Sequence, residues 1–341
     1  MSAQARMDED HMGQPRSVIA VDLGGTKLTV AIVDDRLREH HAIHREIAGL
    51  PYDRVIQTTV DTIAQLAVEH PEVAGIGVAA AGQVDERTGI ISHREIRRGE
   101  EEREIAALAV HEYALAELIR ERTGLPAFVE NDGNAAVLAE WRAGVGQGKG
   151  NVVCLVIGTY MGSGVVARGS LVRRRTSGPL LGGIVTPDPT TRELRYLGVL
   201  VGGNVLEAAA AMGGEPAMPG KEPERTAVAP TAAAIAARAR AGDPEALRLF
   251  EAVAASLRIA CINAINEWDC EVLALAGGLI AGASDLLLPG LQAFVEEWRL
   301  PGADETGPNI ALARFGGDAG MIGAALWALE NLGLPFAIEE R

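Results

Sequence analysis

The hexapeptide DLGGTK at residues 22–27 combines a carboxylate, two glycines and two hydrogen-bond donors within one short stretch. Its glycines let the backbone turn tightly and approach a ligand without a Cβ in the way. Backbone N–H groups in such a turn bind phosphate, and the adjacent carboxylate can hold the metal ion of that phosphate. The bland alternative is a Gly-Gly hairpin with a solvated lysine, because a short motif alone is weak evidence. The candidate residues are Asp22, Gly24, Gly25, Thr26 and Lys27.

A second glycine-rich turn stands at residues 158–164, between an apolar strand that begins at residue 152 and another that runs to residue 168. Two strand–turn–strand units in one chain predict two similar half-molecules, each presenting a phosphate turn to a shared cleft. A dinucleotide-binding motif is excluded, because the glycine spacing differs and a strand rather than a helix follows the turn. The candidate residues of this turn are Gly158, Thr159 and Gly162.

A third glycine-rich stretch, residues 144–150, contains the pair Gly148-Lys149 and so invites comparison with a P-loop. Residue 150 is glycine, where magnesium coordination by a P-loop requires serine or threonine, and no long helix follows. We therefore interpret this stretch as a linker.

Polar residues also gather in the segment ENDGN at residues 130–134. A short predicted strand, 128–129, precedes the segment and a predicted helix, 135–142, follows it. Asp132 therefore stands at a position that is typical of a helix N-cap. A carboxylate at such a point can also take a proton from a reacting hydroxyl, and the two roles are compatible.

The elements predicted around these motifs alternate between strands and helices. A strand pair, a helix and a buried strand open the chain, which predicts an α/β domain with a central mixed sheet. A Gly-rich turn opens a C-terminal helix within residues 316–332. The other predicted strands and helices are strands 18–21, 28–33, 73–81 and 271–281, the last ending in Gly277-Gly278, and helices 55–70, 111–123, 231–241 and 244–267.

Composition sets the broad class of the protein. At 341 residues and 48% apolar content the chain exceeds one ordinary core, so we expect two domains with a ligand cleft between them. No apolar run reaches the roughly 18 residues of a membrane span, and residues 1–16 lack a signal peptide's apolar core. We therefore predict a cytoplasmic protein with no membrane partner. A net charge of −15 argues against nucleic acid as a partner but not against a nucleotide. Isolated cysteines in apolar segments, at 154, 261 and 270, predict buried thiols.

Five separated motifs together resemble the ROK family of sugar kinases and related repressors, within the actin-like ATPase superfamily. The motifs are DLGGTK at 22–27, ENDGNAAVLAE at 130–140, IGTYMGSG at 157–164, ALAGGL at 274–279 and DAGMIGAA at 318–325. Each motif is weak alone, but five in order argue against coincidence. The resemblance implies an α/β fold of two ribonuclease-H-like domains that close over ATP and a sugar, and it implies a homodimer. It places the N-terminal domain at 17–131 with the helix 319–341, and the C-terminal domain at 132–318, after a disordered lead-in at 1–16.

The resemblance also implies roles for single residues. Asp132 matches the general base that takes a proton from the substrate hydroxyl, and Asn131 matches a ligand of sugar hydroxyls. Asp22 matches the carboxylate that orders magnesium through water, and Gly82 lies in the substrate loop. The other residues implied for ATP binding are Gly24, Gly25, Thr26, Lys27, Gly158, Thr159, Gly162, Gly277 and Gly278.

The chain departs from the family pattern where the sugar and a structural zinc would bind. A typical GE-x-GH segment would supply a Glu and a His, yet residues 176–192 contain no Glu, His or Cys. The downstream CxCGxxGCxE cluster corresponds to residues 196–208, which contain no cysteine, so we predict that zinc is absent. Without zinc, residues 176–200 should be held by apolar packing or by a dimer partner. Glu207 matches the final Glu of the cluster, a sugar ligand, but is equally consistent with an exposed helix-start acid.

The substrate loop differs as well, because the usual Pro-Gly is Ala81-Gly82 and the usual sugar-binding Asn is replaced within Ser92–Arg98. The mixed charges of this segment, and of Arg173–Arg175, could contact a modified substrate or form a solvated face.

We therefore expect an ATP- and magnesium-dependent kinase that phosphorylates a primary hydroxyl of a sugar or sugar-like polyol. The lost Glu and His favour a modified hexose, an amino sugar or a seven-carbon cyclitol as substrate. The alternatives are an ordinary glucokinase or hexosamine kinase, and a non-catalytic sensor or scaffold with this fold. Against a repressor, residues 1–16 leave no room for a DNA-binding domain.

Overall fold

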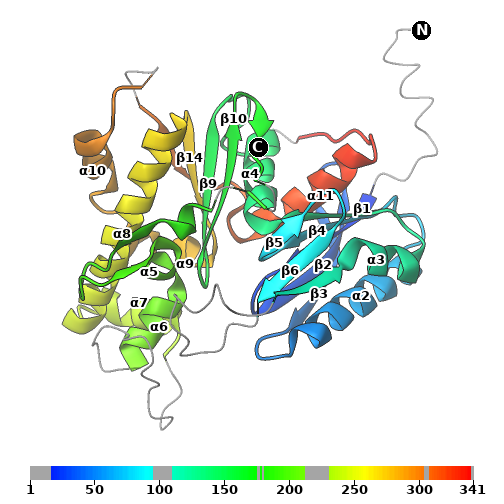
Figure 1. The fold of residues 1–341 in the computed structure, drawn as a ribbon, viewed down its shortest axis with the longest axis horizontal. Coiled ribbons are helices and arrows are strands. Elements are labelled where there is room, and N and C mark those ends of the chain that lie inside the picture. Colours follow the sequence, from blue (N-terminus) through cyan, green and yellow to red (C-terminus); the bar gives the residue numbers. More distant parts are fainter. Residues whose placement is uncertain are drawn as a thin grey trace.

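The computed structural model describes residues 17–94, 110–174, 177–178, 180–211, 230–302 and 307–338. Its ribbon has two α/β halves, each built on one large sheet, with two helices between the sheets (Figure 1). Because each sheet buries an apolar face against helices, each half has its own core.

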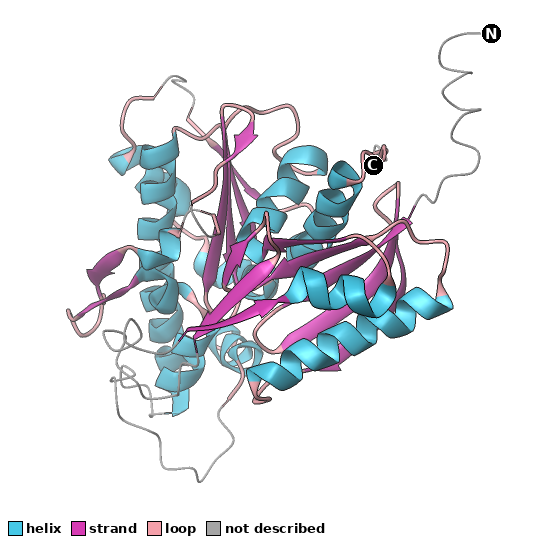
Figure 2. Cartoon of the chain, turned by 45° about the vertical axis from the view of Figure 1, so that its right-hand side comes forward, coloured by secondary structure: helices cyan, strands magenta, loops and turns pink. Residues whose placement is uncertain are grey.

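The N-terminal sheet has the strand order β3-β2-β1-β4-β8. The first strands pair antiparallel across the turn at residues 24–26, as the sequence predicts, while β1–β4 and β4–β8 pair parallel. Two helices, α2 and α3, lie across one face of this sheet (Figure 2). These elements are β1 (Ser17–Leu23), β2 (Lys27–Asp34), β3 (Glu39–Glu46), β4 (Ile76–Ala80), β8 (Ala127–Asn131), α2 (Tyr52–Glu69) and α3 (Leu115–Thr123).

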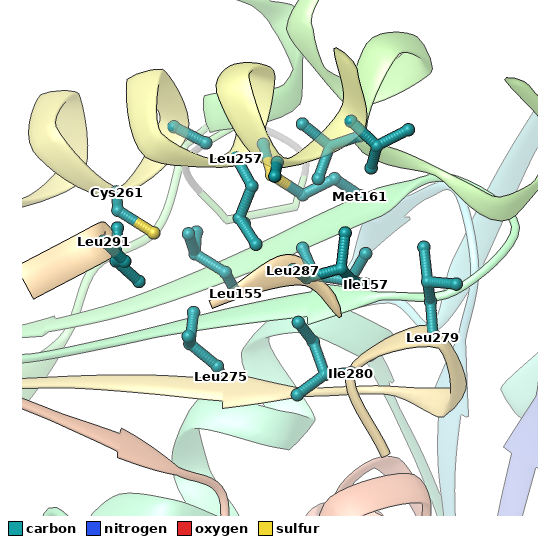
Figure 3. Close-up of a cluster of buried hydrophobic side chains, with 14 of the residues drawn as sticks. Leu155, Ile157, Met161, Leu257, Cys261, Leu275, Leu279, Ile280, Leu287 and Leu291 are labelled. Atoms are coloured by element: carbon teal, nitrogen blue, oxygen red, sulfur yellow. The ribbon is translucent and has the colours of Figure 1, made fainter. Parts of the chain in front are cut away.

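The C-terminal sheet repeats this topology in the order β11-β10-β9-β14-β15, with the same antiparallel and parallel pairings. The expectation of two similar half-molecules is thereby confirmed. Its core lies between the sheet and α8, where Leu257 and Cys261 face Leu155 of β9 (Figure 3). These elements are β9 (Val152–Ile157), β10 (Met161–Ala167), β11 (Ser170–Leu171), β14 (Val272–Ala276), β15 (Asn309–Leu312), α7 (Ala232–Arg240), α8 (Pro244–Trp268), α9 (Gly278–Leu287) and α10 (Leu291–Trp298).

Helix α8 is long and apolar enough to cross a membrane by length and composition. Its most apolar window is 56% buried inside the protein, which is the behaviour of a core helix. All three cysteines are buried free thiols, as predicted.

Two smaller sheets stand outside the main ones. The order β5-β6-β7 forms a three-stranded sheet, and β12 pairs with β13 in a hairpin. The remaining elements are β5 (Gln83–Asp85), β6 (Ile90–Arg94), β7 (Val110–Ala114), β12 (Val185–Pro187), β13 (Leu194–Tyr196), the 3₁₀ helices η2 (Leu181–Gly183) and η3 (Gly316–Asp318), and the helices α5 (Leu197–Val201) and α6 (Gly203–Ala211).

Two predicted elements have a different secondary structure over part of their length. Residues 110–114 form strand β7, not the start of a helix, because they pair antiparallel with β6, and helix α3 begins only at Leu115. Pairing with a distant strand overrides the local helical spacing here. The strand predicted over 271–281 ends at Ala276, because Gly277 turns the chain with a φ of 95° and α9 begins at Gly278.

Helices α4 (Asp132–Ala143) and α11 (Ala319–Asn331) pack against each other between the two large sheets. Their close approach depends on glycine: a Cβ on Gly323 of α11 would overlap the carbonyl oxygen of Ala135 in α4. A Cβ on Gly77 of β4 would likewise overlap the carbonyl oxygen of Ala324. The helix pair is therefore fixed at backbone distance to the N-terminal sheet.

We expect Gly323→Ala to lower the free energy of unfolding by about 1–3 kcal/mol, because the new methyl group can only be accommodated if α4 and α11 separate. The matched control is Gly282→Ala in α9, where an added Cβ meets no atom within 4 Å. That control should be neutral or stabilising by up to about 1 kcal/mol. Denaturant unfolding of both variants measures the difference, and equal stabilities would contradict the packing described here.

Candidate active site

Parallel pairing brings the predicted catalytic and magnesium-binding residues to one edge of the N-terminal sheet. Asp22 of β1 pairs with Ala79 of β4, and Ala80 pairs with Asn131 at the end of β8. Because the carboxyl ends of parallel strands meet at one edge, Asp22 lies on the same edge as the start of α4. Gly82 follows β4 at this edge and adopts a φ of 107°, which favours glycine.

Asn131, not Asp132, caps helix α4. The Asn131 Oδ1 accepts hydrogen bonds from the backbone N–H groups of Gly133 at 3.1 Å and Asn134 at 3.2 Å. Its Nδ2 donates to the Gly82 carbonyl oxygen and to Asp132 Oδ1, both at 2.9 Å. The Gly133 N–H also donates to Asp132 Oδ1, at 2.8 Å, so two hydrogen bonds orient the Asp132 carboxylate beside Gly82.

The start of α4 lies directly on strand β10 of the other half. A Cβ on Gly133 would overlap the carbonyl oxygen of Ser163, and a Cβ on Gly164 would overlap the carbonyl oxygen of Gly133. Only glycine at both positions permits this approach. Asp132 is consequently held next to the strand that follows the second phosphate turn.

Arg173 joins the two halves behind Asp132. Glu130 is buried, and its Oε1 accepts hydrogen bonds from the Asn131 N–H at 2.8 Å and Asn134 Nδ2 at 3.0 Å. Its Oε2 pairs with Arg173 Nη2 at 2.7 Å. Arg173 follows β11 of the C-terminal sheet and also lies 3.7 Å from a carboxylate oxygen of Glu86. The sequence left this arginine open as a solvated or substrate-binding residue, whereas the structure uses it to neutralise Glu130.

Glu140, the last residue of the ENDGNAAVLAE motif, has a structural role that the sequence analysis missed. Its fully buried carboxylate accepts hydrogen bonds from the backbone N–H groups of Val145, Arg314 and Phe315 at 3.0–3.1 Å. These bonds hold the loop after α4 and the loop that leads to η3 and α11. Glu140 therefore sets the position of Asp318 at the start of α11.

Two carboxylates at the cleft have raised pKa values although each keeps part of its surface exposed. Burial, followed by repulsion from Asp132 and Asp318, raises the pKa of Asp22 to about 7. Burial also raises the pKa of Asp132 to about 6, against the hydrogen bonds from Gly133 and Asn131. The repulsion identifies Asp318 as a third acid of this site, to which the sequence analysis gave no role.

The carboxylates near Asp22 could hold a magnesium ion only if water and substrate phosphates supply most of its ligands. Within the described residues, no group of three or more His, Cys, Asp or Glu could hold a metal ion. Magnesium is commonly bound by one or two carboxylates together with waters and substrate phosphates, so this set is compatible with magnesium.

The first phosphate turn is open to solvent. The Gly24 N–H donates to the Lys27 carbonyl oxygen at 3.0 Å, and the Thr26 carbonyl oxygen accepts hydrogen bonds from the N–H groups of Ile47 and Ala48. An added Cβ at Gly25 would meet nothing within 4 Å. Residues Gly25, Thr26 and Lys27 are exposed, and the Lys27 ammonium group has no partner among the described residues. The turn therefore presents unpaired donors and a cation, as phosphate binding requires.

The second phosphate turn borders a cavity of about 360 Å³. Gly158 and Thr159 line one side of the cavity, and Gly278 and Leu279 of α9 line another. The carboxyl ends of β9 and β14 bring these segments together, because Ala276 pairs with Val156. Gly162 does not lie in the turn, since it pairs with Val156 within β10. The cavity thus unites the predicted second phosphate motif with the predicted adenosine motif.

Glu207 lines this same cavity, on α6. Its Oε1 accepts a hydrogen bond from the Ala232 N–H at 3.1 Å, at the start of α7. The structure therefore places Glu207 with the predicted nucleotide residues. A smaller cavity of about 140 Å³ lies on the other side of α6, between the β12–β13 turn and α8.

The segment that lacks the sugar and zinc ligands is packed by apolar residues, as expected. Leu181, Leu197 and Val201 are buried in the C-terminal core, and the Leu181 N–H donates to Ser163 Oγ at 3.1 Å. In the hairpin, Arg195 and Asp188 approach to 3.8 Å.

The substrate-side charges are only partly described. His93 stacks on Tyr52 of α2, with ring centroids 3.6 Å apart and planes at 3°. Glu95–Arg98 and Arg175 lie outside the described residues, so their role in substrate binding stays a prediction.

The chain is similar to known proteins over most of its length. The model of the ROK family matches residues 18–178 and 207–331. The glucokinase of Thermotoga maritima is 28% identical over 327 residues, covering 93% of this chain and 98% of the relative.

Two solved structures share the fold. The ROK hexokinase of Thermus thermophilus is 26% identical, with a TM-score of 0.68 and coverage of 93% of this chain and 99% of that one. The ROK family glucokinase of Streptomyces griseus, solved in complex with glucose and AMPPNP, is 24% identical, with a TM-score of 0.67 and coverage of 91% and 98%. Because the ROK family model matches most of this chain, the chain belongs to the ROK family.

Proposed function

We propose that the protein transfers the γ-phosphoryl group of ATP to a primary hydroxyl of a sugar or sugar-like polyol, with Asp132 as general base. The observation that carries this proposal is the position of Asp132, next to the open end of the N-terminal sheet and against β10. Its pKa of about 6 leaves it ionised at neutral pH but basic enough to accept a proton. Membership of a family that includes sugar kinases supports the same reaction.

In the proposed reaction the acceptor oxygen attacks the γ-phosphorus of ATP, its proton passes to Asp132, and ADP leaves. Phosphoryl transfer depends on positioning and on neutralising charge. Asn131 fixes the carboxylate of Asp132, while Lys27 and the backbone N–H groups of both turns face the phosphates. Asp22 would hold magnesium through water, and the ion would neutralise charge that develops on the phosphate oxygens. The raised pKa of Asp22 is consistent with a site that favours a bound cation.

The acceptor site supports a substrate other than plain glucose. The family model leaves residues 179–206 unmatched, and these include most of residues 176–192, where the sugar-binding Glu and His are missing. A pocket with fewer polar groups discriminates less among ring hydroxyls and is roomier. We therefore propose a modified hexose, an amino sugar or a seven-carbon cyclitol as acceptor, and we propose that the segment needs no zinc. Glucose remains the second candidate, because the Thermotoga maritima relative, of which the match covers 98%, is named a glucokinase.

We expect Asp132→Asn to lower kcat by about 10²–10⁴-fold, because the amide cannot accept the hydroxyl proton. ATP affinity should change little, since the substitution leaves both phosphate turns intact. Asp61→Asn, on the exposed face of α2, is the matched control and should keep wild-type turnover. A coupled ADP-release assay measures both, and an Asp132→Asn enzyme with wild-type kcat would refute the assignment.

Asp22→Asn should stabilise the ligand-free protein at pH 8 while abolishing turnover. Because folding raises the pKa of Asp22 from its ordinary value of 3.8 to about 7, the folded state binds this proton more tightly than the unfolded chain. Ionisation therefore costs stability as pH rises from about 4 to 7, and the cost is complete above pH 7. Thermal unfolding across pH 4–8 should show a gain for Asp22→Asn that shrinks toward pH 4. A variant less stable than wild type at pH 8 would contradict the burial argument.

The substrate proposal predicts that glucose is not the best acceptor. ADP release should be compared across glucose, N-acetylglucosamine, N-acetylmannosamine, 3-amino-3-deoxyglucose and valiolone-type cyclitols. We expect the highest kcat/KM with 3-amino-3-deoxyglucose, an amino sugar with a free amine, or with a cyclitol. A clear maximum for glucose or an N-acetylhexosamine would mean that other residues replace the lost Glu and His, with His93 and Arg94 as the first to examine.

A further inference from the structure

We propose that Glu207, together with Asn204, recognises the ribose hydroxyls of the nucleotide rather than the acceptor sugar. This inference rests on the proposed function only in taking ATP as the nucleotide. The family resemblance implies that Glu207 is a ligand of the acceptor sugar, and this inference assigns it to the nucleotide instead.

The first support is the position of α6, which begins on the second phosphate turn. The Gly203 N–H donates to the Gly158 carbonyl oxygen at 2.8 Å, and the Asn204 N–H approaches the Thr159 carbonyl oxygen at 3.4 Å. A Cβ on Gly202 would overlap the Thr159 carbonyl oxygen. Side chains of the first turn of α6 are therefore placed beside bound phosphates, where the ribose of a nucleotide must lie.

The second support is the shape and composition of the cavity. Small residues of α7 and α9 form two of its walls, which leaves apolar surfaces that suit a base. These wall residues are Ala232, Ala233, Ala236, Gly278, Gly282 and Ala283.

The third support is that two acceptor oxygens on α6 are left without a hydrogen-bond partner at the cavity within the described residues. Asn204 Oδ1 is buried and has no hydrogen-bond partner among the described residues. Glu207 accepts the Ala232 N–H at the start of α7 through Oε1, and its Oε2 has no hydrogen-bond partner in the part of the chain that the structure describes. The only cation lining the cavity, Arg240, is already engaged by Asp285 at 2.7 Å and by the Gly282 carbonyl oxygen. Two acceptor oxygens without a free cation disfavour a phosphate group beside α6 and suit a ligand group that donates hydrogen bonds.

Ribose hydroxyls meet that requirement at this place. Asn204 and Glu207 are three residues apart on α6 and so lie on one face of the helix. Asn204 is the nearer of the two to the phosphate turn, so the pair runs from the phosphate end of the cavity toward the base. A buried acceptor that gains a donor from the ligand contributes affinity, and it penalises an analogue that lacks the donor.

The test measures nucleotide binding without any acceptor, by calorimetric titration of ATP and 2′-deoxy-ATP in the presence of magnesium. 3′-Deoxy-ATP is titrated in the same way. If Glu207 or Asn204 binds a ribose hydroxyl, wild type should bind ATP about tenfold or more tightly than the analogue that lacks that hydroxyl. Glu207→Gln retains an oxygen to cap α7, and it should weaken ATP binding while reducing this discrimination. Asn204→Ala should act in the same direction, and Glu117→Gln, on the surface of α3, should change neither.

Turnover kinetics separate this inference from the proposed function. With an active acceptor, Glu207→Gln should raise the KM for ATP and leave the KM for the acceptor within about twofold of wild type. A raised acceptor KM with unchanged ATP affinity would overturn the inference and restore Glu207 as a sugar ligand. If ATP binding discriminates as expected but no acceptor is phosphorylated, the proposed function fails and the nucleotide assignment stands.

Discussion

The structure depends on backbone-to-backbone packing at the start of α4. Gly133 of α4 meets Ser163 and Gly164 of β10, and Gly323 of α11 meets Ala135 on the other side of the same helix. No side chain can enter these contacts, so the helix that begins with Asp132 is fixed to both halves of the molecule at once. The cleft geometry follows from this constraint, because each large sheet is positioned by the pair of helices between them.

Charge is distributed around this contact in two ways. Behind Asp132, Arg173 neutralises the buried carboxylate of Glu130, which also accepts hydrogen bonds from Asn131 and Asn134. In front of it, burial raises the pKa values of Asp22 and Asp132, and repulsion from Asp132 and Asp318 adds to the shift at Asp22. The protein thus pairs the buried carboxylate of Glu130 with a cation, whereas the Asp132 carboxylate at the cleft is held by hydrogen bonds from Gly133 and Asn131.

Local motifs predicted much of this site, because short stretches of sequence are enough to recognise glycine turns and strand ends. Both hairpins, the strand before Asp132 and the helix after it followed from such stretches. The roles of Arg173, Glu140 and the cavity position of Glu207 did not, because each depends on a partner far away in the chain. For the same reason residues 110–114 were mistaken for helix, since only their pairing with β6 makes them a strand.

The central claim is that the γ-phosphoryl group of ATP is transferred to a primary hydroxyl in the cleft. Proton-coupled ³¹P NMR of the reaction with the best acceptor and magnesium tests it most directly. The account predicts a new phosphomonoester signal split into a triplet by the two protons of the phosphorylated carbon, in amounts equal to the ADP formed. A doublet would show transfer to a secondary position. Inorganic phosphate as the sole new product would contradict the claim of a sugar or polyol kinase.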